Sequence, residues 1–74
     1  MIKTVGEWIE YYLERYGRLY RVRIENQDVG SFTYHYWEFR KIPKDVLALP
    51  AKRAWSRNRT DEYGIIDREL VITY

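Results

Sequence analysis

The only histidine of the chain, His35, is the residue whose chemistry stands out, because an imidazole can exchange a proton near neutral pH. It lies between two tyrosines in a stretch rich in β-forming residues, and no nucleophile or second base pairs with it at a recognisable spacing. A histidine that faces solvent, or packs partly against its own strand, is therefore the preferred interpretation. The alternative is a general acid or base.

The other residue types give no second route to catalysis. With one histidine and no cysteine, the chain lacks the clusters that hold zinc. Its acidic residues run along a predicted helix or lie near a loop, and its four glycines stand singly, without a phosphate-binding loop. No serine or threonine lies in a nucleophile-elbow pattern. The sequence thus predicts a protein that is not an enzyme and uses neither metal nor cofactor.

The segment from Lys52 to Arg59 combines cations with a tryptophan. Its candidate binding residues are Lys52, Arg53, Trp55, Arg57 and Arg59. Arginine and lysine neutralise phosphates, and an exposed tryptophan can stack on a base, which contributes about 1–3 kcal/mol per base. Arg40, Lys41 and Lys44 could extend this patch. The segment predicts nucleic-acid binding if Trp55 is exposed, and an ordinary strand with solubilising arginines if Trp55 is buried.

A second candidate surface is formed by Tyr36, Trp37, Phe39 and Arg40. The chain contains eight Tyr, three Trp and two Phe among 74 residues. Large aromatic side chains stabilise a small core, which is the simpler explanation of their number. A domain of this size exposes some of them, however, and Tyr, Trp and Arg are enriched in interface hot spots. The leading hypothesis is therefore a non-enzymatic accessory factor that binds another protein.

Composition and charge set the frame for these hypotheses. A chain of 74 residues is expected to form one domain, and domains this short bury only about 60% of their unfolded surface. The net charge of +2 is uneven, since residues 31–60 carry seven basic and two acidic residues. Such a basic region can attract an anionic partner or complement a neighbouring acidic strand. No apolar run approaches a membrane span or a signal peptide, so a cytoplasmic protein is expected. The oligomeric state stays open.

Residues 4–16 are predicted to form the helix that supports these surfaces. Their apolar residues recur at helical spacing and form one stripe: Val5, Trp8, Ile9, Tyr12, Leu13 and Tyr16. Thr4 and Glu7 have the spacing of a capping box, and Gly17 suits the residue after the helix.

Strands are predicted at residues 19–25, 31–41, 51–57 and 69–74. Alternation slips near Tyr36 and Trp37, which indicates a bulge or a strand covered on both faces. Pro43–Leu47 is expected to form a short helical turn. The fold class is therefore α+β, with one helix packed on an antiparallel sheet of three or four strands. The sheet face under the helix would be supplied by Val22, Ile24, Phe32, Tyr34, Leu70 and Ile72.

Three segments carry a resemblance: Thr4–Tyr11, Ile42–Leu47 and Glu69–Tyr74. In their order along the chain, they resemble small proteins encoded by phages, prophages and plasmids, among which are inhibitors of host defence such as anti-CRISPR proteins. The resemblance implies a protein that modulates or inhibits a host protein, and it brings no catalytic residues. Many such inhibitors are acidic mimics of nucleic acid, a pattern from which this basic chain departs. The start of the chain, a helix and two strands with a histidine on an early strand, also resembles small ribonuclease toxins of toxin–antitoxin pairs, although the Gly/Ser-rich approach to that histidine is missing. This resemblance implies a small His35-dependent ribonuclease as a further alternative.

Overall fold

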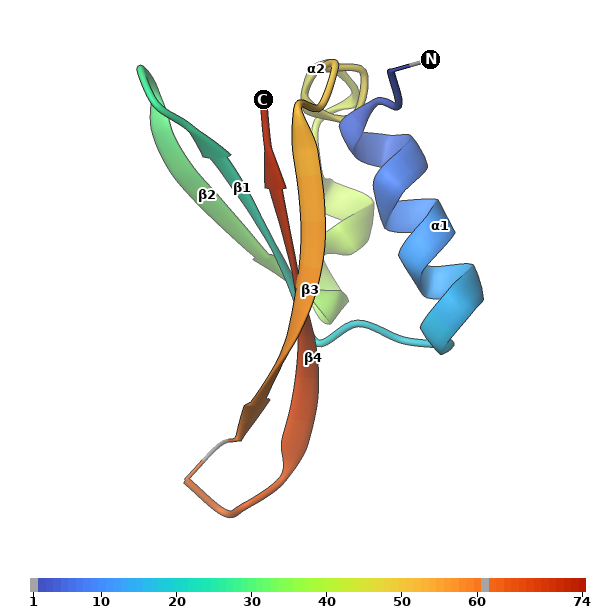
Figure 1. Cartoon of the computed structure of the whole chain (residues 1–74), viewed down its shortest axis with the longest axis vertical. Coiled ribbons are helices and arrows are strands. Elements are labelled where there is room, and N and C mark those ends of the chain that lie inside the picture. Colours follow the sequence, from blue (N-terminus) through green and yellow to red (C-terminus); the bar gives the residue numbers. More distant parts are fainter. Residues whose placement is uncertain (1, 61) are drawn as a thin grey trace.

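The computed structural model of the chain describes residues 2–60 and 62–74. Its elements follow the order α1 (Val5–Tyr16), β1 (Arg21–Asn26), β2 (Gly30–His35), the 3₁₀ helix η1 (Tyr36–Lys41), α2 (Lys44–Leu47), β3 (Arg53–Thr60) and β4 (Ile66–Thr73). Figure 1 shows the helix α1 beside a strongly twisted sheet from which the β3–β4 hairpin extends. The predicted α+β class with four strands is confirmed.

The helix α1 begins and ends as its sequence predicts. The Glu7 N–H donates to Thr4 Oγ1 (3.2 Å), and the Thr4 N–H donates to Glu7 Oε1 (2.9 Å). This capping box satisfies two N–H groups that the first helical turn leaves free. At the other end, Gly17 adopts a φ of 81°, a conformation that favours glycine, and its N–H donates to the Leu13 carbonyl.

The sheet has the order β2-β1-β4-β3 and is mixed rather than wholly antiparallel. The two hairpins β1–β2 and β3–β4 are antiparallel, but β1 and β4 run parallel in the centre. The reason lies in the connection after β2. It carries the chain through η1 and α2 to the opposite edge, where β3 starts a hairpin that brings β4 back beside β1.

Three predicted strand boundaries are wrong by more than two residues. The second strand ends at His35 instead of residue 41, because the Glu38 side chain accepts the His35 N–H (3.2 Å) and caps η1. This change of element explains the slip in alternation. The third strand covers residues 53–60 and so continues past its predicted end at residue 57, and the last strand already begins at Ile66. The short helix after Pro43 is confirmed.

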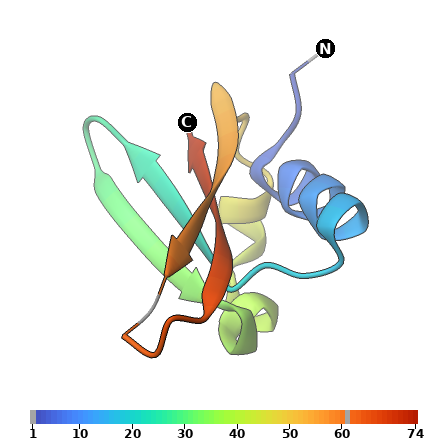
Figure 2. The same cartoon turned by 60° about the horizontal axis from the view of Figure 1, so that its bottom comes forward.

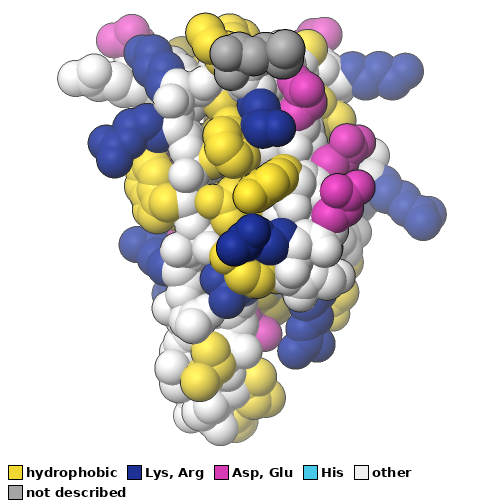
Figure 3. All heavy atoms as spheres, turned by 45° about the vertical axis from the view of Figure 1, so that its right-hand side comes forward, with side chains coloured by type: hydrophobic (Ala, Val, Ile, Leu, Met, Phe, Trp, Pro, Cys, Tyr) yellow, Lys and Arg dark blue, Asp and Glu magenta, His cyan; other side chains and the backbone are white. Residues whose placement is uncertain are grey.

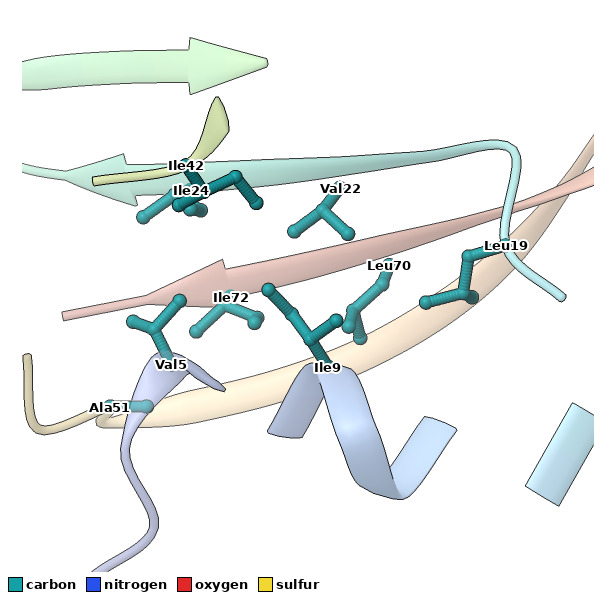
Figure 4. Close-up of a cluster of buried hydrophobic side chains, with 9 residues drawn as sticks. All are labelled: Val5, Ile9, Leu19, Val22, Ile24, Ile42, Ala51, Leu70 and Ile72. Carbon is teal, nitrogen blue, oxygen red and sulfur yellow. The ribbon is translucent and has the colours of Figure 1, made fainter. Parts of the chain in front are cut away.

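The core lies between α1 and one face of the sheet. In Figure 4, Val5 and Ile9 point from α1 toward β1 and β4. Val22, Ile24, Leu70 and Ile72 are fully buried on that face, as predicted, and Tyr34 is partly buried. The prediction that the helix covers Phe32 is wrong, since Phe32 is 43% exposed. It lies on the edge strand β2, at the border of the sheet and away from its centre.

Candidate nucleic-acid interface

One face of the sheet carries no helix. Side chains from η1 and α2, and from the loops beside them, pack against the same apolar cluster as α1 (among them Phe39, Ile42, Val46, Leu47 and Leu49). All three helical segments therefore lie on the core side of the sheet, which Figure 2 shows from a second direction. The opposite face of the described strands is open to solvent.

Strand alternation and register identify the residues of this second face, called the open face below. They are Ser31, Thr33 and His35 on β2, Arg21, Arg23 and Glu25 on β1, Asp67, Glu69, Val71 and Thr73 on β4, and Arg53, Trp55, Arg57 and Arg59 on β3. One row across all four strands reads His35, Arg21, Glu69, Arg57. Five arginines and three carboxylates lie on this face, so it is basic.

Glu69 is the centre of the open face. Its side chain is 1% exposed, although no helix covers it. Arg21 from β1 binds Glu69 Oε2, Arg57 from β3 places Nη2 2.6 Å from Oε1, and Arg59 places Nη1 3.3 Å from Oε2. These four residues are called the arginine cluster. Three guanidinium groups share one carboxylate, so the cluster has an excess of positive charge.

The arginines of the cluster remain open to solvent on their outer side. The side chains of Arg57 and Arg59 are 51% and 48% exposed. A guanidinium has five N–H donors, and one carboxylate cannot use those of three arginines. The outward N–H groups are therefore placed to bind a further anion, and phosphate suits their planar geometry.

Trp55 lies in the next row of the open face. It pairs with Val71, which is 2% exposed, and Arg23 flanks the same valine from β1. Trp55 itself is 38% exposed, and the Arg53 guanidinium lies over its ring, 5.7 Å from the centroid. The sequence left open whether Trp55 is buried. Its indole lies on the solvent side of the sheet, beside two arginines.

Beyond this row, the open face continues into a groove of about 450 Å³. Arg23 and Lys52 bring positive charge to its lining, with Ser31 and Thr73 as polar neighbours and Glu25 as an acid. The Arg23 Nε lies 2.7 Å from Glu25 Oε1, so part of this charge is neutralised. Lys52 is exposed and precedes β3, and it thereby extends the basic surface that the sequence predicts for residues 52–59.

The other end of the open face is aromatic. The Trp37 ring stacks on His35, with centroids 4.6 Å apart and planes at 10°, and Trp37 is 59% exposed. His35 Nδ1 lies 3.1 Å from Glu38 Oε1. The pKa of Glu38 is lowered, first because it accepts the His35 backbone N–H and then because of the His35 ring. Capping of η1 thus accounts for the His35–Glu38 contact.

The remaining predicted residues lie elsewhere. Phe39 packs against the core from η1, so it does not belong to the predicted surface with Tyr36 and Trp37. Arg40 is exposed on η1. Tyr36 is 59% exposed and lines a groove of about 680 Å³ between the end of α1, η1 and the start of β4. This tyrosine groove is lined by Tyr16, Tyr20, Tyr36, Phe39, Ile66 and Arg68 among others.

The tyrosine groove belongs to the side of the molecule that carries the helices. The Arg68 guanidinium lies 3.8 Å from the centroid of the Tyr16 ring. The pKa of Tyr16 is lowered, chiefly through a hydrogen bond with Arg15. Figure 3 shows hydrophobic side chains at the surface on this side, among charged ones.

Sequence reasoning missed Glu69, Arg21 and Arg23 as parts of the site. They stand on strands that alternate correctly, so their face could be predicted, but their partners could not. The parallel pairing of β1 with β4 is what brings Arg21 to Glu69. A signal was present in the acidic residues 61–74 beside the basic residues 31–60, a distribution that is consistent with an anionic partner and equally with charge complementarity between neighbouring strands.

Among residues 2–60 and 62–74, no group of acidic, histidine or cysteine side chains is arranged to hold a metal ion. No helix in these ranges has the length and apolar character needed to cross a membrane. Comparisons with protein-family models, with curated proteins and with solved structures find no significant match to the chain.

Proposed function

We propose that the chain binds single-stranded nucleic acid on the open face. The observation that carries the proposal is the arginine cluster: three arginines surround one buried carboxylate on an uncovered sheet face, beside an exposed tryptophan. The excess positive charge attracts phosphates, and the outward N–H groups bind them. The geometry supports this function better than the protein-binding hypothesis, because it gathers both kinds of contact on one surface.

Trp55 favours a single strand over a duplex. An indole that lies on a sheet can stack only on a base whose face is accessible, and bases in a duplex are stacked on each other. Trp37 offers a second stacking surface at the far end of the open face, next to His35. A strand that runs between the two tryptophans would pass over the arginine cluster.

The test is fluorescence anisotropy with a labelled single-stranded oligonucleotide over a range of salt concentrations. For single strands, the slope of log K against log salt is about −0.7 per neutralised phosphate. We expect Arg53→Gln and Arg57→Gln each to weaken binding and to make the slope shallower by about 0.7. Arg53 does not contact Glu69 in the described contacts, so its loss leaves the buried carboxylate paired.

Lys44→Gln is the matched control. It removes one positive charge from α2, on the core side of the sheet, and leaves the open face unchanged. Binding and slope should stay near the wild-type values. Binding that does not respond to salt, or that Lys44→Gln weakens as much as Arg53→Gln does, would contradict the proposal.

A protein partner is the second candidate function, and the exposed tyrosine groove is the observation that favours it. A Tyr36→Ala variant should lose a stoichiometric partner that the wild type captures from a bacterial host lysate, whereas Arg53→Gln should keep it. Capture of no stoichiometric partner would count against this candidate. This second proposal includes a phage or mobile-element origin, inhibition of a host protein and a cytoplasmic location.

Ribonuclease activity of His35 remains a prediction. Glu38 and Trp37 hold the ring in place, but their contacts are also those of a helix cap and an aromatic stack. Cleavage of RNA by the wild type that His35→Ala abolishes would support it. Intact RNA after incubation with the wild type would reject it.

A further inference from the structure

The two edges of the sheet differ in how they are protected. Edge strands expose unpaired N–H and C=O groups, and proteins commonly guard them with charged residues, proline or bulges. The edge strand β3 carries three arginines, Arg53, Arg57 and Arg59. The edge strand β2, with the sequence Gly-Ser-Phe-Thr-Tyr-His, has no charged residue and no proline. No described element lies beside the outer edge of β2 in Figures 1 and 2.

The backbone groups on the free edge of β2 can be identified. Just beyond the strands, in the same register, the Tyr36 N–H donates to the Tyr20 carbonyl (2.9 Å), as in a hydrogen-bonded pair of the β1–β2 ladder, while the Tyr20 N–H donates to the Arg68 carbonyl. Since such pairs alternate along an antiparallel ladder, the groups of Ser31, Thr33 and His35 point away from β1. The His35 N–H is already bound by Glu38 Oε1 (3.2 Å). Ser31 and Thr33 therefore hold the free donors of this edge.

We propose that β2 pairs antiparallel with β2 of a second copy of the chain, centred on Phe32. In this register Ser31 faces Thr33 of the second copy and exchanges both backbone hydrogen bonds with it. Thr33 pairs in the same way with Ser31 of the second copy. The free N–H groups of Ser31 and Thr33 in both copies are then satisfied, and the His35 N–H keeps its bond to Glu38.

The same register explains the exposure of Phe32. Phe32 would face its own copy as a non-hydrogen-bonded pair, in which side chains come closest. Two rings that are 43% exposed in one chain would then cover each other. A register centred on Thr33 would need the His35 N–H that Glu38 holds. The free groups and the exposed ring therefore select one register.

The dimer would enlarge the surface described above. A two-fold axis perpendicular to the sheet keeps both open faces on the same side, so two arginine clusters would share one continuous sheet surface. This inference does not depend on the proposed function, since pairing of β2 involves no arginine. Four hydrogen bonds and two rings make a small interface, and we expect weak, concentration-dependent association.

The first test is oxidative cross-linking of the full chain, which contains no cysteine of its own. Facing residues of a non-hydrogen-bonded pair have Cα atoms about 4.5 Å apart, within disulfide range. Phe32→Cys should form a disulfide-linked dimer, and Thr33→Cys, the matched control one residue away, should form far less. Preferential cross-linking of Thr33→Cys would overturn the register and with it the proposal.

The second test uses charge across the interface and keeps Phe32 intact. Ser31→Lys/Thr33→Lys would place lysines opposite each other, whereas Ser31→Lys/Thr33→Glu would place each lysine opposite a glutamate. Sedimentation equilibrium over a concentration series should give dimers for the wild type, at least several-fold weaker association for the first variant, and restored association for the second. If the wild type stays monomeric, the proposal is overturned, and the outer edge of β2 would instead be available to pair with a strand of another protein.

Discussion

The two faces of the sheet bury their central residues by opposite means. On β4, Glu69 and Leu70 are neighbours in the chain, and both are almost fully buried. Leu70 is covered on the core face by apolar side chains. Glu69 is covered on the open face by the guanidinium groups of Arg21, Arg57 and Arg59. Apolar side chains exclude water from Leu70 on the core face, whereas arginine side chains exclude it from Glu69 on the open face.

The difference indicates what each face contributes. Burial of an isoleucine or leucine contributes roughly 1.5–3 kcal/mol to folding. A buried ion pair contributes little compared with apolar residues of similar volume, because its charges lose their hydration. Apolar burial therefore explains the core face, and pairing of the buried Glu69 carboxylate explains one arginine on the open face but not all three. A bound anion on their outer side would explain the gathering of all three.

Loss of the Glu69 charge should have the largest effect on this comparison. Glu69→Gln would leave three guanidinium groups without their shared carboxylate. Because Arg57 and Arg59 are about half exposed and water can solvate their charges, we expect the loss to stay below the roughly 3–5 kcal/mol of a fully buried pair. A loss of this order is still a substantial part of the stability expected of a domain this short, about 0.05–0.15 kcal/mol per residue. Urea unfolding followed by circular dichroism measures the change. Glu62→Gln, in the exposed loop, is the control and should shift stability by less than about 0.5 kcal/mol.

Removal of the Trp55 indole should separate binding from folding. Trp55→Ala removes a stacking surface, so we expect single-strand affinity to fall by about 1–3 kcal/mol for the base concerned. Trp8→Ala on α1 is the control for the loss of an indole, because Trp8 lies on the core side of the sheet. Anisotropy titrations of the two variants decide the point. Equal losses of affinity in both would remove the special role of the open face.

A smaller change on the core face should act on stability alone. Ile72→Val deletes one buried methyl group and should cost about 0.5–1.5 kcal/mol of unfolding free energy, with single-strand affinity unchanged. Val29→Ala in the turn, where Val29 is 65% exposed, should cost less. Thermal unfolding and anisotropy measured on the same samples test this. A large loss of affinity in Ile72→Val would mean that the two faces are not independent.

The smallest expected effect is the pH dependence of the α1 cap. The pKa of Glu7 lies below its ordinary 4.5, first because Glu7 accepts the Thr4 backbone N–H. A lowered pKa stabilises the fold above 4.5, and this contribution is lost as the pH falls through the folded-state value. Glu7→Ala should therefore lower the melting temperature at neutral pH more than in acid. Glu14→Ala, outside the capping box, controls for the loss of a helical carboxylate.

The sequence predicted local structure well where residues within a single helix or strand determine it. The capping box of Thr4 and Glu7, the helix stripe and the alternation around Val22 and Ile24 depend on neighbours in the chain. All are confirmed except the last residue of the stripe, Tyr16, which is 40% exposed. The end of β2 was not predicted, because the residues after His35 favour a strand by their type, whereas the Glu38 side chain caps a 3₁₀ helix there. Residues 36–41 therefore form η1 although Tyr36, Trp37 and Phe39 favour strands.

The candidate site was predicted in part. Arg53, Trp55 and Arg57 lie on one strand face, as the predicted strand at residues 51–57 indicates, and Arg59 joins them because the strand continues to residue 60. Their partners required the strand order, in which β4 returns to the centre beside β1. A sheet taken as wholly antiparallel gives no reason to bring Arg21 to Glu69. Long-range pairing, rather than local propensity, separates the predicted segment from the observed cluster.

The most direct test of the central claim is a titration of ¹⁵N-labelled protein with a single-stranded oligonucleotide, followed through the three tryptophan indole N–H resonances. Trp55 lies on the open face, Trp37 stacks at its end on His35, and Trp8 lies on the helix side. The account predicts the largest shift for Trp55, a smaller shift for Trp37 and none for Trp8. Equal shifts of all three resonances, or a shift of Trp8 alone, would contradict it.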